Sequence, residues 1–277
     1  MKVIKQGLYI VPTPIGNLDD ITIRALEILK NSDIILCEDT RRSLKLLNNF
    51  NIKKKLISYH KFNEKQKLSN IIEYLNEGKI LSLISDAGTP TLSDPGYLLI
   101  QECIKQKIDV FPIPGASSIT TAMSISGFDN KFIFYGFLPK TEKELEKELS
   151  KLKNLEYSLV FFITGIKINF YLKNFKHFFS DRNILLAREM TKIHETFYRS
   201  EVENMQLFKS PLKGEITVVI SKKIHTNKPF DNIELKKQAK KYLNKYSLKD
   251  VVELISQKEK ISKKKVYEIC LKIKNND

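Results

Sequence analysis

The chain has 277 residues, of which 42% are hydrophobic and 29% are charged, and this balance is ordinary for a soluble globular protein and excludes a disordered one. Its length exceeds that of one typical domain, so we expect two domains or one two-domain enzyme with a small appendage. The net charge of +15 favours a polyanionic partner such as nucleic acid, although a lysine-rich composition from a nucleotide-biased genome gives the same charge.

The sequence contains neither a signal-peptide-like start nor an apolar run of about 20 residues, so we expect a cytoplasmic protein without a membrane span. The three cysteines, Cys37, Cys103 and Cys270, are too widely separated for a zinc site or a redox pair, and we expect them to be reduced and buried. The histidines are equally scattered, so we expect no metal. They stand at positions 60, 177, 194 and 225.

The first part of the chain alternates short apolar runs with amphipathic stretches. This pattern predicts an α/β domain with a parallel sheet that helices cover on both faces. The predicted strands are 7–12, 33–38, 55–59, 79–85 and 109–113. The predicted helices are 20–32, which Asp19 or Asp20 would cap, and 42–49, 64–76 and 94–106.

Two prolines, a glycine and two serines at 112–118 mark a break, after which the pattern restarts and predicts a second α/β domain. Its predicted helices are 117–126, 141–154 and 167–179. Its predicted strands are 132–136, 158–163, 183–187, 195–200 and 215–221.

From residue 230 the composition shifts to helical repeats of charge and leucine, with two helices that Ser247 and Ser262 would cap. Residues 231–277 hold thirteen lysines and seven acidic residues, a net charge of +6. A helix-turn-helix-like module in contact with nucleic acid and a purely structural pair of helices both fit this pattern. The predicted domains are therefore 1–113, 114–229 and a helical extension at 230–277.

Three loops that follow predicted strands are rich in glycine, proline and small polar residues: 11–20, 85–96 and 112–118. In an open α/β sheet, ligands bind beyond the carboxyl ends of the strands. Gly16 and Gly88 would let the backbone approach a ligand closely, and hydroxyls and carboxylates would line a polar pocket. A rigid turn without a ligand explains 11–20 taken alone, but three such loops favour one cleft.

Six blocks in order resemble the signature motifs of one family: Gly7-LYIVPTPIGNLDDIT, Cys37-EDTR, Ser85-DAGTPTLSDPG, Pro114-GASS, Tyr135-GFLP and Arg188-EMTKIHE. They are similar to those of the 16S ribosomal RNA (cytidine-2′-O)-methyltransferase family, which acts on cytidine 1402 and belongs to the tetrapyrrole methylase superfamily. The resemblance covers about residues 7–221, and the tail resembles the family's helical extension less specifically.

The resemblance implies two α/β domains with S-adenosyl-L-methionine in the cleft between them, 16S ribosomal RNA of the small subunit as the substrate, and a homodimer. It also implies the cofactor-binding positions, taken over motif by motif. These are Ile15, Ala87, Gly88, Thr89, Leu92, Ser118, Ile119, Ile163, Met190 and Glu215.

The tetrapyrrole branch usually has glycine-rich first and second loops, whereas this chain has Pro-Thr-Pro-Ile-Gly16 and Ala87-Gly-Thr-Pro90. This departure favours an RNA substrate, and a corrin or porphyrin precursor stays as the alternative. A catalytically silent RNA-binding protein is a third reading, against which the three pocket loops argue.

Methyl transfer to a ribose 2′-oxygen needs the oxygen placed in line with the leaving sulfur, and a general base would help. The candidates for a direct catalytic role are Asp39, Asp86, Glu189 and Lys192, with His60 as a further possible base. Arg41 is a candidate for holding a phosphate by its planar fork. Each has a structural alternative: a helix cap for Asp39, a surface loop for His60, and an ion pair between Arg188 and Glu189.

Overall fold

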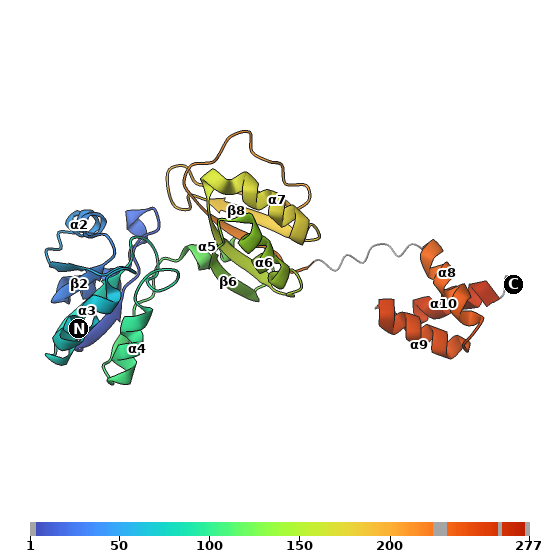
Figure 1. The fold of residues 1–277 in the computed structure, drawn as a ribbon, viewed down its shortest axis with the longest axis horizontal. Coiled ribbons are helices and arrows are strands. Elements are labelled where there is room, and N and C mark those ends of the chain that lie inside the picture. Colours follow the sequence, from blue (N-terminus) through green and yellow to red (C-terminus); the bar gives the residue numbers. More distant parts are fainter. Residues whose placement is uncertain (1–3, 224–231, 260–261, 275–277) are drawn as a thin grey trace. The chain divides into compact units, whose positions relative to one another are not determined.

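The structure is a computed structural model that describes residues 4–223, 232–259 and 262–274. The chain divides into two compact units, Met1–Ile224 and His225–Asp277, which are described one at a time (Figure 1). Among the described residues, no helix has both the length and the apolar character that crossing a membrane requires.

The first sheet confirms the predicted parallel α/β pattern. Its five strands run in the order β3-β2-β4-β1-β5, and every neighbouring pair is parallel. The strands are β1 (Gly7–Ile10), β2 (Ile34–Cys37), β3 (Lys55–Ser58), β4 (Ile80–Ile84) and β5 (Val110–Pro112). Because all five are parallel, their carboxyl ends meet at one edge, where the glycine- and proline-rich loops emerge.

The helices of this part are α1 (Ile23–Asn31), α2 (Thr40–Asn49), α3 (Glu64–Asn76) and α4 (Tyr97–Lys105), preceded by a short 3₁₀ helix η1 (Leu18–Asp20). They pack on the two faces of the sheet as two hydrophobic clusters, around Leu8 and Leu36 on one face and around Val11 and Ile35 on the other. The predicted cap of α1 is wrong: Thr22 accepts from the Ala25 N–H, while Asp19 and Asp20 belong to η1, which Asn17 caps.

The second sheet is mixed, with strand order β6-β7-β10-β8-β9. Its strands are β6 (Phe132–Phe137), β7 (Ser158–Thr164), β8 (Asn183–Arg188), β9 (Thr196–Glu201) and β10 (Glu215–Ile220). Only β6 and β7 are parallel, and β10, last in the sequence, lies between β7 and β8. The helices are α5 (Ser118–Ser124), α6 (Glu142–Leu152) and α7 (Ile168–Phe179), with a 3₁₀ turn η2 (Gly165–Lys167).

A buried arginine ties together the end of this sheet away from the loops described below. Arg182 is 1% exposed and stacks over the Phe179 ring. Its guanidinium donates to the carbonyls of Lys153 (2.7 Å), Leu155 (2.8 Å), Tyr157 (3.3 Å) and Ser221 (3.3 Å). One side chain thus joins the connection before β7 to the residue that follows β10.

The second unit has three helices, α8 (Asn232–Leu243), α9 (Leu248–Glu259) and α10 (Lys263–Lys274), one more than the two capped helices the sequence predicts (Figure 1). They share a hydrophobic core of their own, which includes Val251, Ile255 and Val266. Ser247 and Ser262 accept hydrogen bonds from Asp250 N–H (3.3 Å) and Lys265 N–H (3.4 Å), as expected of helix caps.

Candidate active site

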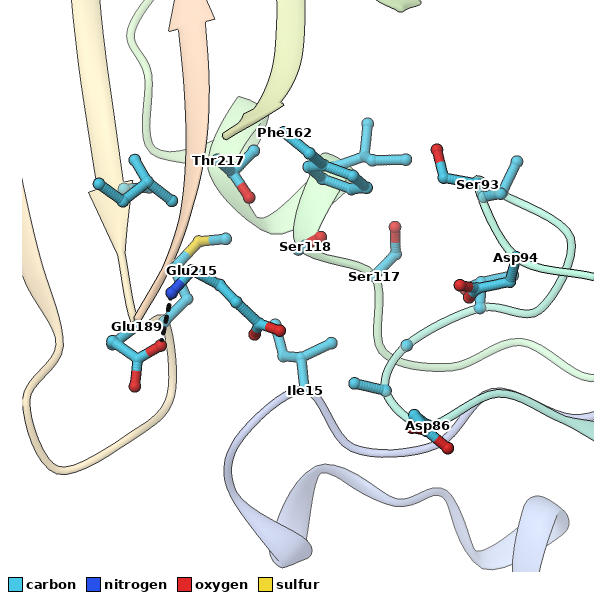
Figure 2. A pocket seen from close by; sticks show the side chains of 18 of the residues that line it. Ile15, Asp86, Ser93, Asp94, Ser117, Ser118, Phe162, Glu189, Glu215 and Thr217 are labelled. Carbon is cyan, nitrogen blue, oxygen red and sulfur yellow. Dashed lines mark hydrogen bonds between the residues drawn. The ribbon is translucent and has the colours of Figure 1, made fainter. Parts of the chain in front are cut away.

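The loops after β1, β4 and β5 surround one cavity together with the ends of β7, β8 and β10 (Figure 2). The cavity has a volume of about 350 Å³, within the range of small-molecule sites. In Figure 2, Asp86 and Asp94 stand on the side of the first sheet, Glu189, Glu215 and Thr217 stand on the side of the second, and Ser117 and Ser118 lie between them.

All ten residues predicted to bind the cofactor line this cavity, although they span positions 15 to 215. They are Ile15, Ala87, Gly88, Thr89, Leu92, Ser118, Ile119, Ile163, Met190 and Glu215. Three of the five proposed catalytic residues, Asp86, Glu189 and Lys192, also line it.

Hydrogen bonds join the three predicted loops to one another. Thr13 and Gly88 exchange two backbone hydrogen bonds of 2.9 Å, and the Thr13 hydroxyl donates to the Ser85 carbonyl (3.0 Å). The Thr89 hydroxyl donates to the Ala116 carbonyl (3.0 Å) in the third loop. Gly88 has φ = +80°, which a side chain would strain. These loops therefore form one preorganised wall.

Backbone strain concentrates in two loops at the cavity. Of the six non-glycine residues with positive φ in the described part of the chain, Thr91 and Ser93 lie in the loop after β4, and Glu189 and Thr191 lie in the loop after β8. Such conformations cost on the order of 1–3 kcal/mol each and persist where the surroundings fix them. The Thr191 hydroxyl accepts a hydrogen bond from the Asn17 N–H (3.0 Å), which links the second of these loops to the first domain.

Three carboxylates gather at the carboxyl edge of the first sheet: Glu38, Asp86 and Asp94. Burial, with the nearby charge of Glu38 and a smaller contribution from Asp86, raises the pKa of Asp94 to about 6, and a hydrogen bond from Ser85 offsets only part of this. Burial and the charge of Asp86 also raise the pKa of Glu38. Asp86 pairs with Arg42 (3.2 Å) and accepts from the Asp39 N–H (3.2 Å).

The opposite side of the cavity carries an ion-paired group. Lys192 Nζ lies 2.9 Å from Glu189 Oε1 and 3.0 Å from Glu215 Oε2, and the Glu215 N–H donates to Glu189 (2.9 Å). Burial alone would raise the pKa of Glu189, but the bonds from the Glu215 N–H and Lys192 lower it. Burial opposes ionisation of Lys192, yet the two carboxylates raise its pKa.

Comparison with known proteins identifies the family. The family model described as tetrapyrrole (corrin/porphyrin) methylases matches residues 7–206. The chain belongs to this family.

Within this methylase family, curated relatives are named ribosomal RNA small subunit methyltransferase I. The relative from Thermotoga maritima is 47% identical over 78% of this chain and 98% of its own length. The relative from Rickettsia prowazekii is 41% identical over 98% of this chain and 99% of its own length. Among solved structures, a Thermus thermophilus uroporphyrin-III C-methyltransferase complexed with S-adenosylhomocysteine is 14% identical, with a TM-score of 0.53 over 78% of this chain and 97% of that chain. It supports the methylase fold alone.

Two predicted site residues of this methylase do not line the cavity. Asp39 caps α2 by accepting from the Arg41 N–H (2.9 Å), and the Arg41 guanidinium bonds to the same carboxylate through Nε (3.1 Å) and Nη2 (2.8 Å). The Arg41 bonds lower the pKa of Asp39 to about 2. Arg41 is 87% exposed, so the pair faces solvent beside the site. His60 lies in the turn after β3, close enough to lower the pKa of Glu38.

Arg188 also differs from its expected pairing with Glu189. Its Nε donates to the Lys213 carbonyl (2.8 Å), and it lines a neighbouring, more open pocket. Among the described residues, no group of three or more His, Cys, Asp or Glu side chains is placed to hold a metal ion.

The cavity includes residues that the sequence analysis did not select. They are Arg42, Ser93, Asp94, Ser117, Phe137, Phe162, Thr164, Ala187, Ile216 and Thr217. The sequence could have indicated Asp94 as a site residue, because it shares a glycine- and proline-rich loop with Asp86. Phe162 and Thr217 belong to strands whose apolar alternation gives no sign that one face lines a ligand site.

Proposed function

We propose that this chain methylates the ribose 2′-hydroxyl of a cytidine in 16S ribosomal RNA of the small subunit, with S-adenosylmethionine as the methyl donor. The observation that carries this proposal is the 41% identity to a ribosomal RNA small subunit methyltransferase I along 98% of the chain. Methylation of ribosomal RNA with S-adenosylmethionine follows from this similarity to curated ribosomal RNA methyltransferases. The ribose oxygen, the cytidine and the small subunit are the finer part of the proposal.

The residues around the cavity fit the cofactor. Its adenine needs an apolar surface, which Ile119, Ile163 and Met190 offer, and its ribose and amino-acid groups need hydroxyls and backbone groups, which Thr89 and Ser118 offer. Four carboxylates line the same cavity and suit a cation: Asp86, Asp94, Glu189 and Glu215. When bound, the cofactor supplies a methyl group on a positively charged sulfur, activated for displacement.

The protein's own contribution is to orient and desolvate the reacting oxygen and to accept its proton. Asp94 is the base we propose. It lines the cavity, and its pKa of about 6 makes it a stronger proton acceptor than an ordinary carboxylate while leaving it mostly ionised near neutral pH. Asp86 is held by Arg42 and the Asp39 N–H, so we assign it to positioning. Glu189 and Lys192 would fix the loop that closes the second side.

The tetrapyrrole alternative rests on distant structures, at 14–17% identity and TM-scores of 0.51–0.59, which speak to the fold alone. No feature of the cavity favours it over RNA. An RNA-binding protein without catalytic activity is also disfavoured, because a binding surface has no need of a pocket lined by strained loops that hydrogen bonds join to one another.

The direct test is incubation of the purified protein with labelled S-adenosylmethionine and either unmethylated 30S subunits or a corrinoid precursor. We expect label in 16S RNA, and mass spectrometry of nuclease fragments should place it on one cytidine ribose. Label in the corrinoid but not in RNA would contradict the proposal. A 2′-O-methyl mark on another nucleotide would contradict only its finer part.

We further propose a homodimer in the cytoplasm, which the resemblance implies and where ribosomal substrates occur. Sedimentation velocity at micromolar concentration tests the assembly: a single species of twice the chain mass of 32.2 kDa is expected. A species of one chain mass at the highest concentration would contradict it.

A further inference from the structure

We propose that the turn at residues 59–63 is a base-stacking platform, on which Phe62 receives a base of single-stranded RNA adjacent to the nucleotide that enters the cavity. This inference rests on the proposed function and extends it, because it names where the substrate strand leaves the active site. The contact is stacking on an aromatic ring with phosphate contacts on either side.

The Phe62 ring is displayed rather than packed. It is 93% exposed, at the apex of a turn that internal hydrogen bonds hold rigid. The Asn63 side chain accepts from the His60 N–H (2.9 Å) and donates to the Ser58 carbonyl (3.2 Å). Lys67 Nζ donates to the same carbonyl (2.9 Å), and the Phe62 N–H donates to the His60 ring (3.3 Å). The turn holds the ring in water, where its aromatic neighbour is His60, edge-to-face with ring centroids 6.1 Å apart.

The turn shares the edge of the sheet on which the cavity opens. β3 pairs in parallel with β2, which pairs in parallel with β4, so the turn follows the same edge as Glu38 and Asp86. His60, two residues before Phe62, interacts electrostatically with Glu38, and Glu38 does so with Asp86 and Asp94, both of which line the cavity. Phe62 thus lies in a loop at the same edge of the sheet as the loop that carries the proposed base.

The turn itself offers cations beside the exposed ring, whereas Glu38, Asp86 and Asp94 belong to other loops of the same edge. Lys61 precedes Phe62 and Lys65 follows it three residues later; both are exposed, and neither has a carboxylate within 4 Å among the described residues. Glu64, between Phe62 and Lys65 in the chain, is half-buried. An exposed ring between cations is the usual arrangement for single-stranded RNA, where bases stack and phosphates pair with lysines. A protein partner would need roughly 800 Å² on this side, whereas one phenylalanine offers about 150–250 Å².

The kinetic test compares Phe62→Ala with Phe62→Tyr in methylation of 30S subunits. Loss of one base stack should raise KM for the subunit about 5- to 150-fold in Phe62→Ala, while Phe62→Tyr stays within about twofold of the wild type. Affinity for S-adenosylmethionine should be unchanged in both. Ile104→Ala is the matched control, because Ile104 is also exposed but lies at the far end of α4, near the amino ends of the strands.

A second measurement uses the absence of tryptophan from this chain. Phe62→Trp places a single tryptophan on the turn, and its fluorescence should be quenched by a cytidine-containing decamer of single-stranded RNA, because a stacked base quenches the indole. Ile104→Trp should show no quenching.

The outcomes separate this inference from the proposed function. If the wild type methylates 30S subunits and Phe62→Ala has an unchanged KM, the platform is wrong and the function stands. If Phe62→Tyr is as weak as Phe62→Ala, stacking is also wrong. If the wild type labels no ribosomal RNA, the proposed function fails, and the platform fails with it.

Discussion

The two sides of the cavity hold the same kinds of side chain in opposite electrostatic states. The acidic side consists of the lining residues Asp86 and Asp94 with the nearby Glu38, and burial and mutual repulsion raise the pKa of Glu38 and of Asp94. The paired side, made of Glu189, Lys192 and Glu215, lowers the pKa of Glu189, because a lysine and a backbone N–H stabilise its charge.

This difference shows which side suits which task. A carboxylate with a pKa of about 6 exchanges a proton readily near neutral pH, as a general base must. A carboxylate that a cation already stabilises keeps its charge and serves as a fixed binding group. We therefore propose that proton transfer takes place on the acidic side and that the paired side orients the cofactor.

We expect the largest loss of activity from a substitution on the acidic side. Asp94→Asn keeps the shape of the side chain but removes the proton acceptor, so kcat should fall roughly 10²- to 10⁴-fold. Affinity for S-adenosylmethionine should change far less. Single-turnover methylation of 30S subunits and calorimetry measure the two quantities.

The pH profile is the control for this variant. The wild-type rate should fall as the pH drops through about 6, because Asp94 is then protonated and no longer accepts a proton. Glu38→Gln removes the neighbouring charge, so the fall should move to lower pH, and Asp94→Asn should lack it. A wild-type profile that stays flat down to pH 5 would exclude Asp94 as the base.

Gly88→Val tests the loop wall that supports the acidic side. The branched side chain would stand at φ = +80°, with its Cβ 3.3 Å from Ile15 Cγ2, so we expect cofactor affinity to fall at least about tenfold. Gly127→Val is the matched control, since Gly127 also has positive φ (+70°) but its Cβ would meet nothing within 4 Å. Both variants should lose about 1–2 kcal/mol of stability from the backbone. Equal cofactor affinity in both would refute the placement of this loop.

Lys192→Met perturbs the paired side. Glu189 and Glu215 lose their shared cation, and the pKa of Glu189 should rise. Because Lys192 is 31% exposed and Glu215 mostly exposed, solvent weakens the pairing, and we expect only about a 3- to 10-fold loss of cofactor affinity with little change in the pH profile. Lys151→Met, which breaks an exposed pair with Glu148, controls for the loss of one surface charge. A shifted pH profile in Lys192→Met would instead indicate that proton transfer takes place on the paired side.

Removal of residues 231–277 deletes no residue of either side and should have the smallest effect on chemistry. About a fifth of this chain has no counterpart in the Thermotoga maritima relative, and the second unit has about that length. If its lysines contact RNA, deletion should raise KM for 30S subunits and flatten the salt dependence by about 0.7–0.9 in the log–log slope per lost phosphate contact. Cofactor affinity should stay the same. An unchanged slope would remove the RNA-binding role of this unit.

The sequence predicted the first sheet well for a physical reason, and the ten positions implied by the resemblance line one cavity. Parallel strands buried on both faces read as continuous apolar runs, and the loops at their carboxyl ends need glycine and proline, so both leave a local signal. The ten proposed cofactor positions came from the family resemblance, whose motifs include these loops, and their contact with the cofactor stays a prediction.

Other features depend on tertiary contacts that leave no local signal. Burial and the charge of Glu38 raise the pKa of Asp94, whereas Asp86 pairs with Arg42 and accepts from the Asp39 N–H, and these contacts join residues that are far apart in the sequence. The helix α1 begins at Ile23 and not at residue 20, because Thr22 caps it and because Asp19 and Asp20 belong to η1. The predicted helix at 94–106 begins only at Tyr97, since Gly96 has φ = +128°.

The buried Arg182 has a consequence for how the enzyme part of the chain ends. Fraying of β10 from its last residue would take the Ser221 carbonyl away from a guanidinium that is shielded from water, and that charge would lose one of its four carbonyl partners. Local opening at this strand is therefore costly, and its amides should exchange with solvent only when the whole sheet unfolds. A strand terminated in this way tolerates any continuation of the chain, so helices can be gained or lost after it during evolution without loosening the catalytic body.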